Sequence, residues 1–141
     1  MERRKILLVE DNEGDVLLTR EAFEEINPRA EINVVQDGRS AVDYLENCIQ
    51  KQSELPELVL LDINLPKMDG HEVLCVIKNS KLMRNIPVIM LTTSSSKNDV
   101  SKAYANFANC YITKPHDVND FFEVIGHIDN FWFKMARLNG V

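Results

Sequence analysis

Short apolar runs alternate along the chain with longer amphipathic segments. Three of these runs, at residues 6–9, 58–61 and 88–91, are continuously apolar. Such runs are typical of strands in a parallel sheet that helices cover on both faces. Two further runs, at 31–36 and 110–114, also have the length and composition of strands. We therefore expect five strands.

The segments between these runs have the length and periodicity of helices. In the first segment, Leu18, Ala22 and Ile26 recur every four residues and form one apolar stripe. We expect five helices, at 15–26, 39–49, 71–79, 98–107 and from Asp117 to about residue 138. Strict alternation of strand and helix predicts the α/β class, with a doubly wound, five-stranded parallel sheet and right-handed crossovers.

The composition is that of one folded domain. The chain of 141 residues is long enough for a single core and too short for a second one. Its formal net charge of −6 disfavours a nucleic-acid partner. The apolar run near the start is too short for a signal peptide or a membrane span. We therefore expect a cytoplasmic protein with no membrane partner.

Polar side chains stand where the expected strands end, and ligands of doubly wound folds bind beyond those ends. The residues found there are Glu10, Asp11, Asp62, Thr92 and Lys114. Three carboxylates packed together repel one another unless a cation compensates, and oxygen ligands without His or Cys favour Mg²⁺. A metal ion, an amine and a hydroxyl together suit a phosphoryl group.

No nucleotide-binding motif accompanies these residues. Neither GxxxxGK[ST] nor GxGxxG occurs in the sequence. We therefore expect the phosphoryl group to reside on the protein itself, with Asp62 as acceptor, because a carboxylate can form an acyl phosphate. Taken singly, a strand-end Asp or Thr more often caps a helix. The five residues together favour the phosphoryl site.

Four motifs give the chain a wider resemblance. The segments LLVEDN, VLLDINLPKMDG, PVIMLTT and CYITKP are similar to those of receiver domains of two-component response regulators, the CheY-like family. The resemblance covers residue 4 to about residue 128 and implies the flavodoxin-like strand order 2-1-3-4-5. It implies that a histidine kinase or phosphotransfer protein phosphorylates Asp62. The chain would then be a signalling phosphoacceptor rather than an enzyme, with self-phosphorylation from small donors and slow self-hydrolysis only.

The resemblance also implies how a metal ion is bound. Asp11, Asp62 and the backbone carbonyl of Asn64 would ligate Mg²⁺, and Glu10 would assist through a water molecule. Asn64 and Ser94 would flank the approach of the hydrolytic water and tune the rate of dephosphorylation.

Three further positions acquire roles through the resemblance. Thr92 and Lys114 would hold the phosphoryl group. Tyr111 would swing inward when Thr92 moves, which makes Thr92 and Tyr111 the switch residues. The Lys114–Pro115 bond would be cis and would help to aim the lysine.

The end of the chain narrows the resemblance. FANCYITKPHDVNDF and IDNFWFKMARL look similar to single-domain regulators paired with cyanobacterial and bacterial phytochrome kinases, which implies a phytochrome histidine kinase as partner. Two positions depart from the family pattern. Phe107 stands where many receivers have Gly, and His116 follows Pro115 where an apolar residue is commoner. We expect both departures to affect the output face rather than phosphorylation.

The last helix is our candidate for the output surface. Its expected core stripe contains Phe121, Val124, Ile125, Ile128, Trp132 and Met135. Phe122, Phe131 and Phe133 fall outside this stripe and would form an aromatic surface for a homodimer or another partner. The alternative is that the C-terminal extension folds back and covers these rings.

Two other classes compete with the receiver interpretation. An aspartyl-phosphate phosphatase of the haloacid dehalogenase type also uses a strand-end Asp, Mg²⁺ and Lys, but it needs an acid where Asn64 stands. A binding module of receiver fold that is not phosphorylated would be expected to have lost an acid, the threonine or the lysine. None of these is missing from the sequence.

Overall fold

A computed structural model of the chain describes residues 3–138. The strands are β1 (Lys5–Val9), β2 (Glu31–Val35), β3 (Leu58–Leu61), β4 (Val88–Thr92) and β5 (Cys110–Thr113). The helices are α1 (Glu13–Ile26), α2 (Gly38–Gln50), α3 (Gly70–Lys78), α4 (Lys97–Ala105), α5 (Val118–Asp129) and the π-helical turn η1 (Asn130–Met135). Within this described range, no helix is long and apolar enough to cross a membrane.

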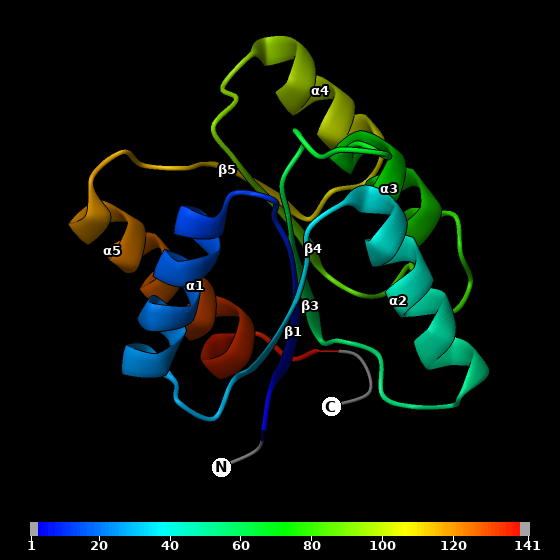
Figure 1. Cartoon of the computed structure of the whole chain (residues 1–141), viewed down its shortest axis with the longest axis horizontal. Coiled ribbons are helices and arrows are strands. Elements are labelled where there is room, and N and C mark those ends of the chain that lie inside the picture. The colour runs from blue at the N-terminus through cyan, green and yellow to red at the C-terminus, as the bar shows by residue number, and fades with distance from the viewer. Residues whose placement is uncertain (1–2, 139–141) are drawn as a thin grey trace.

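The five strands form one parallel sheet in the order β2-β1-β3-β4-β5. Figure 1 shows α1 and α5 on one face of the sheet and α2, α3 and α4 on the other. The predicted doubly wound CheY-like α/β fold is therefore confirmed. Because all the strands run in one direction, the residues that follow them meet at one edge of the sheet.

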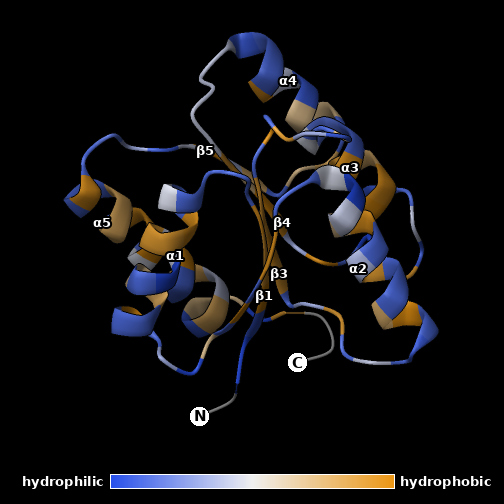
Figure 2. Ribbon diagram, in the orientation of Figure 1, coloured by the Kyte–Doolittle hydropathy of each residue, from blue (hydrophilic) through white to orange (hydrophobic). Residues whose placement is uncertain are grey.

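Each face of the sheet has its own hydrophobic core, because successive side chains of a strand point to opposite faces. Leu7 and Val9 of β1 pack with α2, α3 and α4, whereas Ile6 and Leu8 pack with α1 and α5. The central strands are hydrophobic throughout, and the helices are hydrophilic on their outer faces (Figure 2). This double burial explains the continuously apolar strand sequences.

A side-chain oxygen fixes the start of each α-helix. The capping residues are Asn12, Asp37, Asp69, Ser96 and Asp117, and each accepts a hydrogen bond from a backbone N–H of the first turn. Such a cap contributes about 1 kcal/mol to helix stability. The caps therefore determine the length of the loop that follows each strand, and these loops carry the polar residues at the sheet edge.

The C-terminal helix differs from the sequence-based prediction. It continues past Asp129 as the π-helical turn η1 and ends at Met135 rather than near residue 138. Phe133 is buried, with 7% of its surface exposed, whereas Met135 is 67% exposed. The prediction had these two residues reversed. A π-helical turn holds more residues than an α-helical turn, so it rotates the following side chains off the predicted stripe.

Contacts with the start of the chain explain why Phe133 is buried. The Arg4 guanidinium lies over the Phe133 ring, 5.4 Å from its centroid, and donates to the Phe133 carbonyl oxygen at 3.3 Å. The buried Asp129 accepts a hydrogen bond from Asn27 Nδ2 at 2.9 Å, and Lys134 Nζ lies 3.5 Å from its other oxygen. Phe133 is therefore a core residue, and its prediction as an interface residue was wrong.

Candidate phosphoacceptor site

Four of the predicted site residues are buried at the carboxyl edge of the sheet. Glu10 follows β1, Asp62 follows β3, Thr92 ends β4 and Lys114 follows β5. They are 2%, 7%, 0% and 7% exposed, in the same order. Asp11, the fifth predicted residue, is exposed beside them. The structure thus brings together residues that are more than a hundred positions apart in the chain.

The three carboxylates form a cluster that fits a divalent cation. Glu10, Asp11 and Asp62 each offer an oxygen, and these oxygens all lie within 4.8 Å of one another. Hard oxygen donors in a cluster of this size are the ligands that Mg²⁺ and Mn²⁺ prefer. The Asn64 backbone N–H donates to Asp62 Oδ1 at 3.3 Å, which fixes the start of the loop after the acceptor.

The electrostatics of Glu10 reflect its burial. Loss of solvent raises the pKa of Glu10 to about 7, and the nearby Asp62 carboxylate adds to this, while Lys114 and a hydrogen bond from the Asn12 N–H oppose it. In the absence of a metal ion, the Glu10 carboxyl group is therefore partly protonated near neutral pH. A bound cation would favour its ionised form.

The Lys114 amine sits among the carboxylates. It donates hydrogen bonds to Glu10, to Asp15 Oδ2 at 2.8 Å and to Asp62 Oδ2 at 3.2 Å. Burial alone would lower the pKa of Lys114. The hydrogen bonds to Asp15 and Glu10, together with the negative charges of Glu10 and Asp62, outweigh burial and hold that pKa above its ordinary value. The lysine is therefore a permanent cation directly beside the Asp62 oxygen.

Sequence reasoning missed Asp15. This residue lies in the first turn of α1, where an acid is usual because it complements the helix dipole. The Asp15 N–H donates a hydrogen bond to Oδ1 of the capping residue Asn12 at 2.9 Å, and this bond orients the turn toward Lys114. The available signal was its place in the helical turn directly after the Glu10 and Asp11 pair. Its pairing with a residue 99 positions away could not be seen from the sequence.

The predicted cis bond before Pro115 is not found. Within residues 3–138 no peptide bond is cis, so the Lys114–Pro115 bond is trans. The Lys114 N–H donates to the Thr92 carbonyl oxygen at 2.7 Å, which extends the pairing of β5 with β4. This backbone hydrogen bond and the side-chain hydrogen bonds to Glu10, Asp15 and Asp62 orient the lysine. The trans peptide bond is also the intrinsically favoured isomer.

The predicted switch residues are linked by hydrogen bonds. The Tyr111 hydroxyl donates to the Ser94 carbonyl oxygen at 2.8 Å, and the Ser94 N–H lies 3.5 Å from Thr92 Oγ1. Burial raises the pKa of Tyr111, and the nearby carboxylates of Asp99 and Asp62 add to this effect. The Tyr111 ring is thus turned toward the loop that follows Thr92.

Gly70 is required where the acceptor loop enters α3. A Cβ at this position would lie 2.1 Å from the Asp62 carbonyl oxygen and 2.7 Å from the Ile63 Cα. Backbone atoms cannot give way as a flexible side chain can, so only Gly fits. This close approach anchors the start of α3 directly against the backbone of Asp62.

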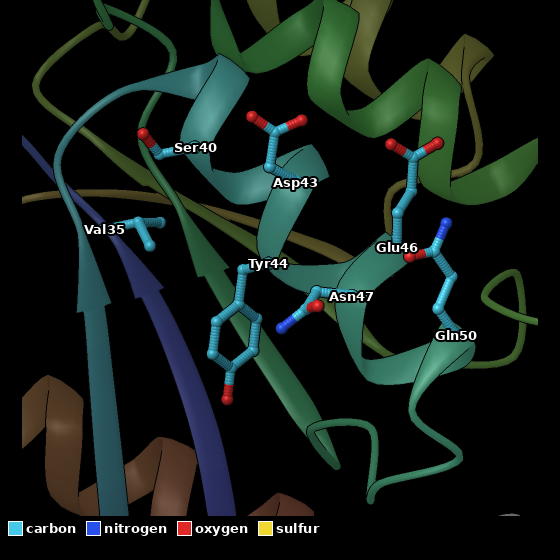
Figure 3. Close-up of a pocket in the computed structure, with 7 residues that line it drawn as sticks. All are labelled: Val35, Ser40, Asp43, Tyr44, Glu46, Asn47 and Gln50. Atoms are coloured by element: carbon cyan, nitrogen blue, oxygen red, sulfur yellow. The ribbon is translucent and has the colours of Figure 1, made fainter.

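A surface groove lies elsewhere, along α2 and beside the end of β2. Its lining residues are Val35, Ser40, Asp43, Tyr44, Glu46, Asn47 and Gln50 (Figure 3). In this view the Tyr44 ring points downward, whereas the carboxylates of Asp43 and Glu46 point upward. None of the lining residues belongs to the carboxylate cluster or contacts Lys114 through a hydrogen bond described above. The phosphoacceptor candidates therefore form a separate site.

Comparison with known proteins defines the class. Residues 6–126 match the model of the response regulator receiver domain. The probable methanogenesis regulatory protein FilR2 of Methanothrix harundinacea is 43% identical over 135 residues, which are 96% of this chain and 87% of that protein. Response regulator Rcp1 of Synechocystis is 39% identical over 134 residues, 94% of this chain and 91% of its own. The chain belongs to the receiver domain family of response regulators.

Solved structures agree with this assignment. The phosphorylated cyanobacterial phytochrome response regulator RcpA superimposes with a TM-score of 0.92 at 39% identity and covers 98% of this chain and 99% of its own. The Mn²⁺-bound form of Rcp1 superimposes with a TM-score of 0.88 at 38% identity, over 96% and 98% of the two chains. A phosphoacceptor role in two-component signalling therefore fits the family, and histidine kinases are the partners of such domains.

Proposed function

We propose that this chain is a single-domain response regulator that receives a phosphoryl group on Asp62 from a histidine kinase. The observation that carries the proposal is the arrangement around Asp62. This carboxylate is buried, has the Lys114 ammonium 3.2 Å away and shares a cluster of oxygens with Glu10 and Asp11. Such a site balances the charge of a phosphoryl group and excludes most of the solvent.

The residues that would hold Mg²⁺ are Glu10, Asp11, Asp62 and the backbone carbonyl of Asn64. When bound, the ion supplies positive charge that neutralises phosphoryl oxygens. Mg²⁺ rather than Mn²⁺ is proposed because it is the usual ion of phosphoryl-transfer sites. The carboxylate oxygens of Glu10, Asp11 and Asp62 are hard ligands that suit either ion.

The transfer itself uses side chains of this chain. An Asp62 carboxylate oxygen attacks the phosphorus atom, and the bond from phosphorus to the kinase histidine breaks as the new P–O bond forms. The electron pair of the broken bond stays on the histidine nitrogen. Lys114 donates a hydrogen bond to one phosphoryl oxygen and the Thr92 hydroxyl to another, and each places charge or a dipole where negative charge collects.

The signal would leave the site through Thr92 and Tyr111. When Thr92 turns toward the phosphoryl group, the loop around Ser94 moves, and the Tyr111 hydroxyl that bonds Ser94 follows it. Asn64 and Ser94 would tune dephosphorylation from the loops after β3 and β4. A phosphorylation-independent binding module of the same fold is the second candidate, and an Asp62→Asn variant separates the two.

We further propose a phytochrome histidine kinase as the partner, supported by the similarity of the chain to response regulators of cyanobacterial and bacterial phytochromes. The test is phosphotransfer from a radiolabelled bacterial phytochrome kinase. Label should pass to the wild-type chain within minutes and not to Asp62→Asn, whose fold is checked by circular dichroism. Label that stays on the kinase, while acetyl phosphate still modifies Asp62, would contradict the partner but not the chemistry.

A homodimer formed through the last helix region is the proposed output. Phe131 is 50% exposed and edge-on to Trp132, with ring centroids 5.1 Å apart, and Phe122 is half-buried on α5. Trp132 is partly buried, so Phe131 is the exposed member of this pair, and aromatic residues at a surface are frequent anchors of protein interfaces. Sedimentation with and without beryllofluoride should detect a dimer that Phe131→Asp weakens. A monomer under both conditions would remove this part of the proposal.

A further inference from the structure

A buried histidine stands directly behind the phosphoacceptor loop. His71 is the second residue of α3, and its side chain is 6% exposed. The preceding Gly70 packs against the backbone of Asp62 and Ile63 so closely that no Cβ fits between them. Main-chain packing therefore fixes the position of His71 relative to Asp62.

His71 joins α3 to the start of α4. Its Nε2 lies 3.0 Å from Asp99 Oδ1, in the first turn of α4. The other Asp99 oxygen accepts a hydrogen bond from Ser94 Oγ at 2.6 Å. The hydrogen bond from Ser94, and to a lesser extent the one from His71, lowers the pKa of Asp99. The ionised Asp99 carboxylate therefore accepts both hydrogen bonds. The loop after β4 is thus tied to α3 through one carboxylate.

The surroundings of the imidazole indicate which nitrogen carries the proton. His71 Nδ1 is buried and has no hydrogen-bond partner within the described part of the chain. A proton on Nδ1 would be an unsatisfied buried donor, whereas a proton on Nε2 points at Asp99. His71 therefore acts as a hydrogen-bond donor to Asp99.

Ser94 connects this arrangement to the switch. Its carbonyl oxygen accepts the Tyr111 hydroxyl at 2.8 Å, and its N–H faces Thr92 Oγ1 at 3.5 Å. Its hydroxyl is held by Asp99 and also lies 3.4 Å from the Ser96 N–H. Ser94 lies in the loop between β4 and α4, and each of its polar groups thus contacts a polar group of β4, β5 or the start of α4.

Serine, aspartate and histidine together could suggest a hydrolase, but their order excludes one. A nucleophilic serine needs the imidazole next to its hydroxyl, with the carboxylate behind the imidazole. Here the carboxylate lies between the other two, so His71 cannot take a proton from Ser94. The group positions a loop and does not activate a nucleophile.

We propose that His71, Asp99 and Ser94 form a brace that lengthens the lifetime of the phosphoryl group on Asp62. This inference rests on the function proposed above. In the hydrolysis that ends the signal, a water oxygen attacks phosphorus, the P–O bond to Asp62 breaks with its electron pair left on the carboxylate, and the water gives up a proton. The products are inorganic phosphate and Asp62.

The brace would slow this step in two ways. It holds the loop after Thr92 against α3, which limits the approach of water to the phosphoryl group. It also engages the Ser94 hydroxyl, so this hydroxyl cannot orient an attacking water. The His71 side chain makes its hydrogen bond with Asp99, so His71 is a positioning residue that acts through Asp99.

The test measures the half-life of the phosphoryl group by intact mass after acetyl phosphate is removed. His71→Leu should shorten the half-life about fivefold, the factor that corresponds to about 1 kcal/mol, the net value of one hydrogen bond. His71→Gln keeps an N–H donor at a similar distance from the backbone and should restore most of the lifetime. Val73→Ala removes buried volume from the same helix and controls for general destabilisation.

A double-mutant cycle separates the brace from a packing effect. Ser94→Ala should itself shorten the half-life, and adding His71→Leu should shorten it no further, because both changes break one chain of hydrogen bonds. Three results would overturn the brace alone. The His71→Leu half-life could equal that of wild type, or His71→Leu and Val73→Ala could shorten the half-life equally. The third result is that His71→Leu has its full effect in the Ser94→Ala background. A wild-type chain that takes up no phosphoryl group would overturn the proposed function and the brace with it.

Discussion

At the scale of single residues, the site is a balance of charges around Lys114. A buried carboxylate such as Asp62 loses hydration, and this loss is offset only if a cation lies close to it. The lysine ammonium at 3.2 Å supplies that cation. Asp62 can therefore be buried at the end of an apolar strand, since Lys114, which follows β5, lies at the same edge of the sheet.

Asp15 should help to hold the lysine amine in position. Replacing it with alanine removes one charge-assisted hydrogen bond to Lys114, and we expect phosphorylation by acetyl phosphate to slow about tenfold. Asp15→Asn keeps an acceptor oxygen and should lose less. Glu13→Ala, an exposed acid of the same helical turn, is the control. Equal rates for all four proteins would mean that Glu10 and Asp62 suffice to orient the lysine.

Glu10 should make the metal-free protein sensitive to pH. Its pKa is about 7 in the folded chain against 4.5 ordinarily, so the folded state keeps a proton that the unfolded state releases. The resulting stability is fully present below the ordinary value and is lost as pH rises toward 7. Melting temperatures measured with EDTA should therefore fall across this interval. Glu10→Gln should flatten the fall, and Glu13→Gln should leave it as in wild type.

Asp11 should matter most when the metal ion is bound. Asp11→Asn removes a metal ligand and one of three repelling carboxylates, so it should weaken Mg²⁺ binding and raise metal-free stability slightly. At a hundredfold excess over its Kd, Mg²⁺ should stabilise the wild-type chain by about 2.7 kcal/mol. Thermal melts with and without MgCl₂ measure both effects. Curves that respond to neither change would contradict the metal cluster.

At the scale of elements, the end of α4 carries an unusual residue. Phe107 has a φ of 70°, in the left-handed region, and the residue is 74% exposed. The Phe107 N–H bonds the Tyr104 carbonyl and the Ala108 N–H bonds the Ala103 carbonyl, the pattern of a helix end that normally uses Gly. Phe therefore adopts here a conformation that costs energy for any residue with a Cβ.

Phe107→Gly should relieve this strain. We expect it to raise the free energy of unfolding by about 1 kcal/mol in urea denaturation. Phe107→Ala removes the ring but keeps the Cβ in the left-handed region, so it should give no such gain. If both variants are as stable as wild type, or if Ala stabilises as much as Gly, the backbone conformation at this helix end is not strained.

The sequence predicted the elements well and the C-terminal end poorly. Continuous apolar runs and four-residue spacing located the strands and the α-helices, because these periods follow directly from backbone geometry. The end of the last helix depends instead on a π-helical turn and on Arg4, which reaches Phe133 from the opposite end of the chain. Periodicity carries no information about such a contact, so the prediction exposed Phe133 and buried Met135, the reverse of what the structure has.

At the scale of the whole molecule, topology explains what could be foreseen of the site. Parallel strands deliver their carboxyl ends to one edge, so Glu10, Asp62, Thr92 and Lys114 could be grouped from strand positions alone. Asp15 and His71 could not, because they act from helical turns whose orientation follows from packing. The bond before Pro115 was assigned from the family resemblance and not from any residue pattern, and the structure has it trans.

Intact-mass spectrometry after incubation with acetyl phosphate and Mg²⁺ tests the central claim most directly. The wild-type chain should gain the mass of one phosphoryl group, and the gain should require Mg²⁺ and be absent in Asp62→Asn. Circular dichroism should show that the variant remains folded. No added mass on the folded wild-type chain, or equal phosphorylation of Asp62→Asn, would contradict the assignment of Asp62 as the phosphoacceptor.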